Sequence, residues 1–163
     1  MTGEKYATTT TVSVERSRGE IETILTKYGA TSFAYGTEPG RAMIAFAAAG
    51  RRIQFTLEIP DQGERRFTHR IDARSGAARP RVPEAAYKEW EQACRSRWRG
   101  LALLIRATLE AVEIGIIPFD TAFLPYTVLP GGRTVADEVR ATVDEAYATG
   151  IMPASLLAIG TGQ

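Results

Sequence analysis

Residues 31–59 read TSFAYGTEPGRAMIAFAAAGRRIQFTLEI, and this stretch decides the fold. It contains three apolar runs, at residues 31–35, 42–48 and 52–59, separated by two short turn sequences. The turn residues are Glu38, Pro39 and Gly40, followed by Ala49 and Gly50. Apolar runs of this length, separated by such turns, predict three consecutive strands.

The third run alternates with a period of two. Its apolar residues are Ile53, Phe55, Leu57 and Ile59, and the residues between them are Arg52, Gln54, Thr56 and Glu58. Successive side chains of a strand point to opposite faces, so this pattern predicts one buried face and one face in water. An antiparallel meander packed on helices has this property.

A short helix is predicted before the meander. Ser17 and Glu20 have the spacing of a capping box, and Gly29 supplies a left-handed C-terminal residue. The apolar residues at helical spacing are Ile21, Ile24, Leu25 and Tyr28. Upstream, the β-branched residues 8–14 predict a further strand, and we expect residues 1–7 to be flexible.

Residues 84–113 predict a long amphipathic helix, which Gly115 and Pro118 end. Its apolar face consists of Tyr87, Trp90, Cys94, Trp98, Leu101, Ile105, Leu109 and Val112. The C-terminal half is apolar on nearly all sides, so we expect a second layer to bury it. The added apolar residues there are Leu103, Leu104, Ala107 and Ala111.

A last helix is predicted after the irregular residues 119–129. Thr134 and Asp137 cap its start, and Gly150 ends it. Its apolar stripe consists of Val135, Val139, Val143 and Ala146. The chain is therefore predicted to be α+β, with an antiparallel three- to four-stranded meander packed against a long amphipathic helix and two shorter helices.

We expect a single domain over residues 1–163, with a mobile basic connection at residues 61–83. Within that connection Phe67, His69 and Ile71 alternate, which allows a fourth short strand. The order α, β, β, β, α resembles that of a double-stranded-RNA-binding domain. That module has a lysine-rich signature at the start of its second helix, whereas residues 84–88 here read EAAYK.

Composition excludes several classes of protein. The chain has 163 residues, of which 44% are hydrophobic, and one cysteine, Cys94, so it forms no intrachain disulfide and no cysteine-based zinc site. No apolar run approaches the about 20 residues that span a bilayer, so we expect no membrane partner and a cytoplasmic location.

Candidate catalytic residues are few. His69 is the only imidazole and lies among arginines, and Cys94 lies on the apolar face of the long helix, so the two are not expected to form a dyad. Gly131 to Thr134 enter a helix and could hold an anion beside Arg133, but a turn with an N-cap is the favoured interpretation. We therefore expect no catalytic residues, no metal site, no cofactor and no enzymatic activity.

The net charge of +1 hides a segregation along the chain. Residues 1–50 are neutral, residues 51–106 carry +6 and residues 107–163 carry −5. Arginine, which binds phosphate in a bidentate manner, dominates the basic part. The arginines predicted to bind nucleic acid are Arg51, Arg52, Arg65, Arg66, Arg70, Arg74, Arg79 and Arg81.

Aromatic residues are interleaved with these arginines, which favours a single-stranded nucleic acid as the partner. Trp90 and Trp98 are the main candidate stacking platforms, although both also lie on the apolar stripe of the long helix, where a core role competes. The alternative partner for the same basic surface is an acidic protein, with the chain acting as an interaction module or as an inhibitor of a host system.

Several strings together resemble a group of small uncharacterised proteins of tailed phages and prophages. The matching strings are residues 27–30, 90–98, 129–135, 145–147 and 150–153. The resemblance implies a phage or mobile-element context and a host cytoplasm, and it transfers no site residues. Handling phage DNA and binding a host protein are the two roles expected in that context.

Overall fold

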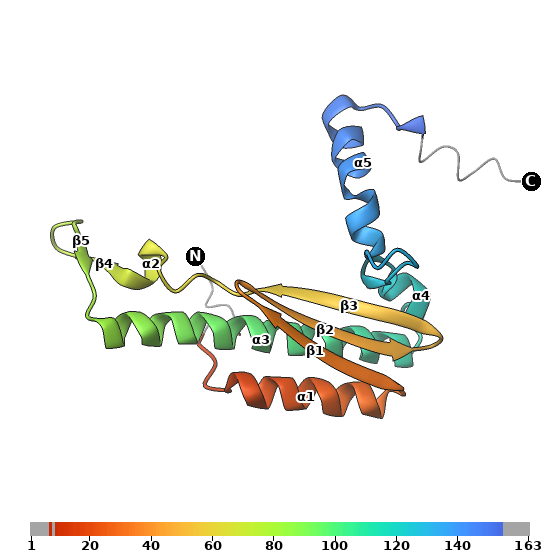
Figure 1. The fold of residues 1–163 in the computed structure, drawn as a ribbon, viewed down its shortest axis with the longest axis horizontal. Helices are drawn as coiled ribbons and strands as arrows, with labels where there is room; N and C mark the ends of the chain where they lie inside the picture. Colours follow the sequence, from red (N-terminus) through yellow and green to blue (C-terminus); the bar gives the residue numbers. More distant parts are fainter. Residues whose placement is uncertain (1–6, 8, 155–163) are drawn as a thin grey trace, which may run out of the picture.

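The computed structural model describes residue 7 and residues 9–154 (Figure 1). The chain has an α+β fold, with a three-stranded antiparallel sheet in the order β1-β2-β3 and a two-stranded sheet β4-β5. The elements are α1 (Val14–Lys27), β1 (Ser32–Glu38), β2 (Arg41–Ala48), β3 (Arg51–Glu58), α2 (Arg65–Thr68), β4 (His69–Ile71), β5 (Ala78–Pro80), α3 (Pro83–Glu113), α4 (Phe119–Ala122), the 3-10 helix η1 (Leu124–Tyr126) and α5 (Val135–Thr149).

The three-stranded meander confirms the strands predicted from residues 31–59. Ile44 pairs with Tyr35 on one side and with Phe55 on the other. The second turn requires left-handed backbone, with φ of 50° at Ala49 and 71° at Gly50, which is the two-residue hairpin geometry that matches strand twist. The predicted turns and the period-two pattern therefore set the register.

The core lies between one face of this sheet and the two helices α1 and α3. Phe46 and Ile53 of the sheet, Ile21 of α1 and Ile105 of α3 belong to the same buried cluster. Glu20 of α1 joins the helices through two ion pairs to α3, with Arg99 and, at 2.6 Å, with Arg106. The opposite sheet face, which includes Ala45, Gln54 and Arg52, is half-buried or exposed.

The start of α1 differs from the prediction. Ser13 is the N-cap, its hydroxyl accepts from the backbone N–H of Arg16 at 3.2 Å, and the helix begins at Val14. Residues 9–13 form no strand, so the strand predicted at residues 8–14 is wrong over the part that the structure describes. Two serines four residues apart are possible caps; Ser13 takes the N-cap position, and Ser17 lies inside the helix with its side chain fully buried. Of the N-terminus predicted to be flexible, residues 1–6 lie outside the described part.

The connection at residues 61–83 contains more regular structure than predicted. It includes the short helix α2 and the strands β4 and β5, which pair from His69 to Ile71. The fourth strand allowed by the alternation around residue 69 is therefore present, but it pairs with β5 rather than joining the meander. Phe67 is buried and anchors α2, which packs on α3.

The helix predicted at residues 84–113 is confirmed as α3. The burial predicted for its C-terminal half is only partial, because Leu103 and Ala111 are half-buried, whereas Leu104 is 44% exposed and Ala107 is also exposed. The sheet and α1 cover two sides of α3, and no described element covers the side on which Leu104 lies.

The C-terminal elements α4, η1 and α5 follow the end of α3. Phe123 is fully buried and stacks edge-on against Phe46 and Phe55, which attaches α4 and η1 to the sheet. The predicted capping box is present at the start of α5, where the Thr134 hydroxyl accepts from the backbone N–H of Asp137 and the Asp137 carboxylate accepts from that of Thr134. α5 nevertheless projects from the body and contains no buried residue (Figure 1).

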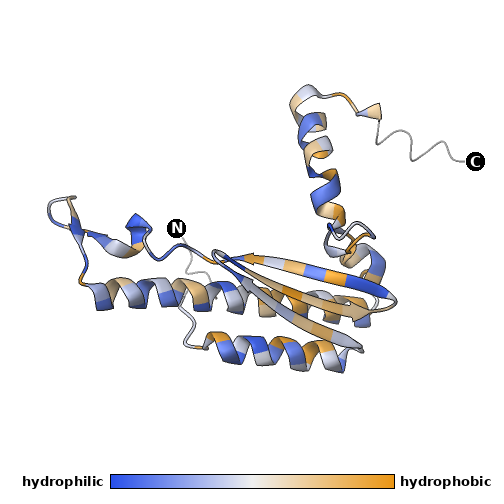
Figure 2. Cartoon of the chain, viewed as in Figure 1, coloured by the Kyte–Doolittle hydropathy of each residue, from blue (hydrophilic) through white to orange (hydrophobic). Residues whose placement is uncertain are grey.

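Hydrophobic residues are distributed along every main element, including the projecting α5 (Figure 2). Within the described residues, none of the helices has the length and apolar content that crossing a bilayer would require.

The two serines of α1 give a direct test of where this helix begins. Ser13→Ala should lower the free energy of unfolding by about 1 kcal/mol, because it removes the N-cap. Ser17→Ala should be neutral or stabilising, because the Ser17 hydroxyl is buried and makes no hydrogen bond within the described residues. Urea denaturation of the two variants measures both effects, and a larger loss for Ser17→Ala would contradict the observed helix start.

Candidate nucleic-acid interface

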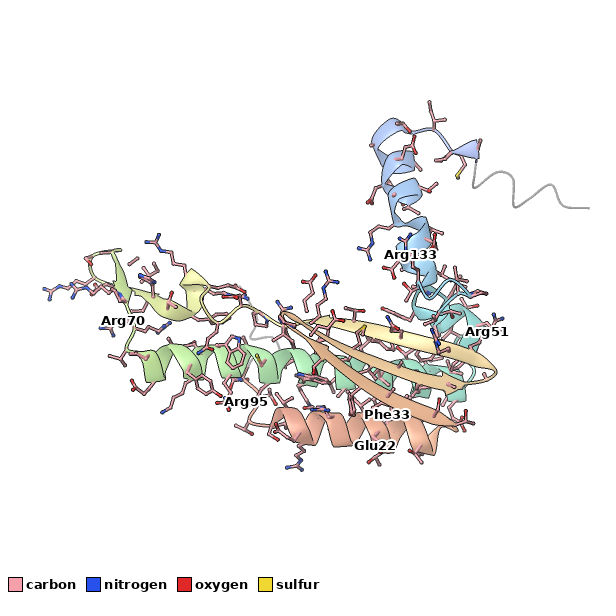
Figure 3. The ribbon with its side chains drawn as sticks, viewed as in Figure 1. Glu22, Phe33, Arg51, Arg70, Arg95 and Arg133 are labelled. Carbon is pink, nitrogen blue, oxygen red and sulfur yellow. The ribbon has the colours of Figure 1, made fainter. Side chains whose placement is uncertain are left out.

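Residues 65–81, here called the basic ribbon, comprise α2, β4, β5 and the turn between the strands. They contain six arginines and one aspartate, a formal charge of +5. The ribbon lies at the N-terminal end of α3, and the labelled Arg70 marks this extremity of the molecule (Figure 3). The densest positive charge of the chain is thus carried on a small projecting element.

The basic ribbon is held to the body by the segment that leads into it and by the packing of α2 on α3. The indole N–H of Trp90 donates to the carbonyl of Pro60 at 2.7 Å, which fixes the segment that leads into the ribbon. The backbone N–H of Arg81 donates to the carbonyl of Thr68 at 2.7 Å and closes the base of the ribbon. Pro83 is the first residue of α3. A backbone N–H at this position has no partner within the helix, so its absence in proline costs nothing.

The register of the basic ribbon places two arginines directly opposite each other. Arg70 of β4 pairs with Arg79 of β5, so both side chains project from the same face. Like charges directly opposite on a ribbon are destabilising. The arrangement therefore needs a negative charge close to that face.

Asp72 supplies part of that negative charge. Its carboxylate accepts from the backbone N–H groups of Ser75 at 2.9 Å and Arg74 at 3.0 Å, and these bonds lower the pKa of Asp72. The same side chain forms an ion pair with Arg79 at 3.3 Å. One ionised aspartate therefore forms the ribbon turn and neutralises one arginine of the opposed pair.

The remaining arginines of the basic ribbon divide into paired and unpaired groups. Arg66 forms an ion pair with Glu64 at 2.7 Å, and Arg81 lies 3.8 Å from Glu89. Within the described part of the chain, three of the predicted site residues in the ribbon have no ion pair. They are Arg65, Arg70 and Arg74.

The structure does not bring Arg51 and Arg52 to the basic ribbon. They lie at the start of β3, whose eight residues span about 26 Å, and the ribbon follows the other end of that strand. Figure 3 labels Arg51 and Arg70 at opposite ends of the molecule. Arg51 pairs with Asp120 of α4 at 3.3 Å. Arg51 and Arg52 therefore lie in a region separate from the basic ribbon, and the predicted arginines do not form one continuous surface.

Of the two tryptophans expected to stack on bases, Trp98 is buried and Trp90 is only partly accessible. Trp98 is only 4% exposed and belongs to the core cluster, with Tyr35 against it. Trp90 is half-buried and is tied to Pro60 through its indole N–H. The core interpretation therefore holds for Trp98. Of the other aromatic residues interleaved with the arginines, Phe67 is buried, and Tyr87 is exposed with its ring 5.5 Å from that of Trp90.

The catalytic and anion-site candidates occupy structural positions. Cys94 is buried in α3, and burial raises the pKa of its thiol, which disfavours the nucleophilic thiolate. Arg133 pairs with Glu138 at 3.4 Å and donates to the carbonyl of Asp137, so its guanidinium is occupied by the helix that it precedes. Across residue 7 and residues 9–154, no three His, Cys, Asp or Glu side chains group as metal ligands.

One contributor to the site was missed at the sequence level. Asp72 lies three residues before Ser75 and four before Gly76, which is a turn signal with a mechanism, because an aspartate side chain bonds backbone N–H groups two and three residues on. This turn signal predicts where the ribbon reverses direction. The position of the turn therefore predicts that Arg70 and Arg79 lie opposite each other.

Comparison with known proteins returns no match to a protein-family model, to a curated protein or to a solved structure. The functional argument therefore depends on the geometry of the basic ribbon.

The lowered pKa of Asp72 predicts how the ribbon turn responds to acid. A depressed carboxyl pKa in the folded chain means that the stabilisation is present above the usual aspartate pKa and is lost as pH falls through the folded value. The amide signals of Arg74 and Ser75 should therefore titrate with a midpoint below 3.8 in an NMR pH series. In Asp72→Ala this titration should disappear, and a midpoint at or above 3.8 in the unsubstituted chain would contradict the hydrogen bonding described.

Proposed function

We propose that the protein is a non-enzymatic nucleic-acid-binding protein, and that the basic ribbon contacts the phosphates of a duplex. The observation that carries this proposal is the opposition of Arg70 and Arg79 on one face of a projecting two-stranded ribbon. Asp72 balances only Arg79, so the Arg70 guanidinium keeps an unpaired charge on this face within the described residues, and it can bind a phosphate in a bidentate manner.

The shape of the basic ribbon supports a duplex partner. The major groove of B-DNA admits a two-stranded ribbon, and phosphates line both sides of the groove. Arg74 at the turn and Arg65 on α2 extend the positive charge beyond the opposed pair. Because Trp98 is buried, phosphate contacts remain and the stacking expected for a single strand loses its main support.

The position of the basic ribbon in the fold gives a second, weaker support. The order α1, β1, β2, β3, α3 resembles that of a double-stranded-RNA-binding domain, in which positive charge lies at the start of the second helix. Here the basic ribbon immediately precedes α3, so the charge comes from an inserted hairpin instead of from the helix. A shared order of elements is an analogy and assigns no function by itself.

Binding to labelled oligonucleotides across a salt series tests the proposal. Double-stranded DNA, double-stranded RNA and a single strand of matched length should be compared by fluorescence anisotropy. We expect the duplexes to bind more tightly than the single strand, with an affinity that falls steeply as salt rises. Absence of binding at low salt, or tighter binding of the single strand, would contradict the proposal.

Two matched double variants localise the interface. Arg70→Gln/Arg79→Gln should weaken duplex binding and lower the salt slope by about 0.9 for each B-DNA phosphate that is no longer neutralised. Arg51→Gln/Arg52→Gln removes the same charge from the other end of the molecule and should leave binding almost unchanged. Equal losses of affinity in both variants would show that net charge, rather than the ribbon, governs binding.

An acidic protein is the second candidate partner for the same surface. The observation that favours it is the exposure of Ile71 at 71% and of Val82 at 64% beside the arginines, because apolar side chains with surrounding charge are typical of protein interfaces. In a phage context such a partner is a host protein. Capture of a host protein by immobilised chain after nuclease treatment, together with loss of capture by Arg70→Gln/Arg79→Gln, would favour this candidate.

A further inference from the structure

The helix α5 has an apolar face that the described chain covers only in part. Its main packing partner is the short helix η1, and the two border an open groove of about 330 Å³. Its lining consists mainly of apolar side chains, among them Leu124, Val139 and Val143, with Arg140 and Asp144 at its edge. Isolated helices of 15 residues are marginal in water, so this face needs a partner surface to hold the helix.

The charges that flank this apolar face define the kind of partner. α5 contains four carboxylates and one arginine, a formal charge of −3. Asp144 and Arg140 both line the groove, and Glu145 lies outside it on the polar side of α5. Neither of these two carboxylates forms an ion pair within residues 9–154. Because α5 keeps a net negative charge despite Arg140, a surface that combines apolar side chains with positive charge complements it.

The basic ribbon has this combination. It carries a formal charge of +5 and exposes Ile71, with Val82 exposed immediately after it. Within one molecule the basic ribbon lies at one end of α3, whereas α5 rises from the other end (Figure 1). A single chain therefore cannot bring the two surfaces together in this conformation, but two chains in opposite orientation can.

We propose that α5 docks on the basic ribbon of a second copy of this chain. The two copies are related by a twofold axis, so the same contact forms twice and both exposed surfaces of each copy are covered. Apolar contacts come from Val139 and Val143 against Ile71, and ion pairs from Asp144 and Glu145 to the ribbon arginines. Charge complementarity sets the antiparallel arrangement and opposes pairing of α5 with α5.

In the dimer, α5 and nucleic acid compete for the same arginines. The dimer is inferred without reference to nucleic-acid binding, and sedimentation of the protein alone tests it. Failure of the dimer and failure of the proposed function are therefore distinguishable.

Sedimentation velocity from low to high micromolar concentration, at low and at high salt, tests the association. We expect the unsubstituted chain to shift from monomer to dimer with concentration and to dissociate at high salt. Asp144→Lys/Glu145→Lys and Arg70→Glu/Arg79→Glu should each raise the dissociation constant by at least about tenfold. Ala141→Lys/Ala148→Lys, which adds charge to the opposite face of α5, should associate as the unsubstituted chain does.

Mixing the two charge-reversal variants gives the decisive measurement. In the mixed pair the lysines on α5 of one copy meet the glutamates on the ribbon of the other, and the second interface is the unsubstituted one, so association should return. Circular dichroism of each variant checks that helix content is retained. A chain that stays monomeric at every concentration, or a mixture that associates no better than its components, would overturn the proposal.

Discussion

The packing of α3 along one face of the β1-β2-β3 sheet is the constraint on which the rest of the structure depends. A helix of 31 residues is about 46 Å long, whereas the eight-residue strands that it crosses span about 26 Å. The sheet therefore covers only part of the helix. The N-terminal part of α3, which the sheet leaves uncovered, carries the basic ribbon, and α2 of the ribbon packs on it. Near the other end of α3, α4 packs against the helix, and Phe123 anchors α4 to the sheet. The basic ribbon thus lies where α3 extends beyond the sheet, whereas α5 rises near the opposite end of the helix (Figure 1).

Much of this architecture follows from local pattern. The strands around Ile44 and Phe55, the long helix and the capped start of α5 were predictable, because their apolar periods and turn residues act within a few positions of each other. The start of α1 was not, since Ser13 and Ser17 are both suitable caps and their local sequence does not distinguish them. The exposure of Leu104 was also beyond local pattern, because it depends on which elements the chain later supplies as cover.

The candidate site shows the same division. An excess of arginine in the middle of the chain was visible in the sequence, but its arrangement was not. The alternation around His69 indicated a strand but not its partner, so the opposition of Arg70 and Arg79 required the register of the ribbon. Arg51 and Arg52 are close to the ribbon in sequence, yet β3 carries them to the far end of the molecule. Proximity along the chain is thus a poor guide to a surface when an extended strand intervenes.

The separation of the basic ribbon from α5 along the length of the molecule also gives the protein a large electric dipole moment. A charge of +5 at one end and −3 on the helix that rises from the other produces a torque in the field of any polyanion. The molecule is turned before contact, so that the ribbon approaches first and α5 is directed away. A chain whose total charge is only +1 thereby gains an orientation preference on encounter, and this preference weakens as salt shortens the Debye length.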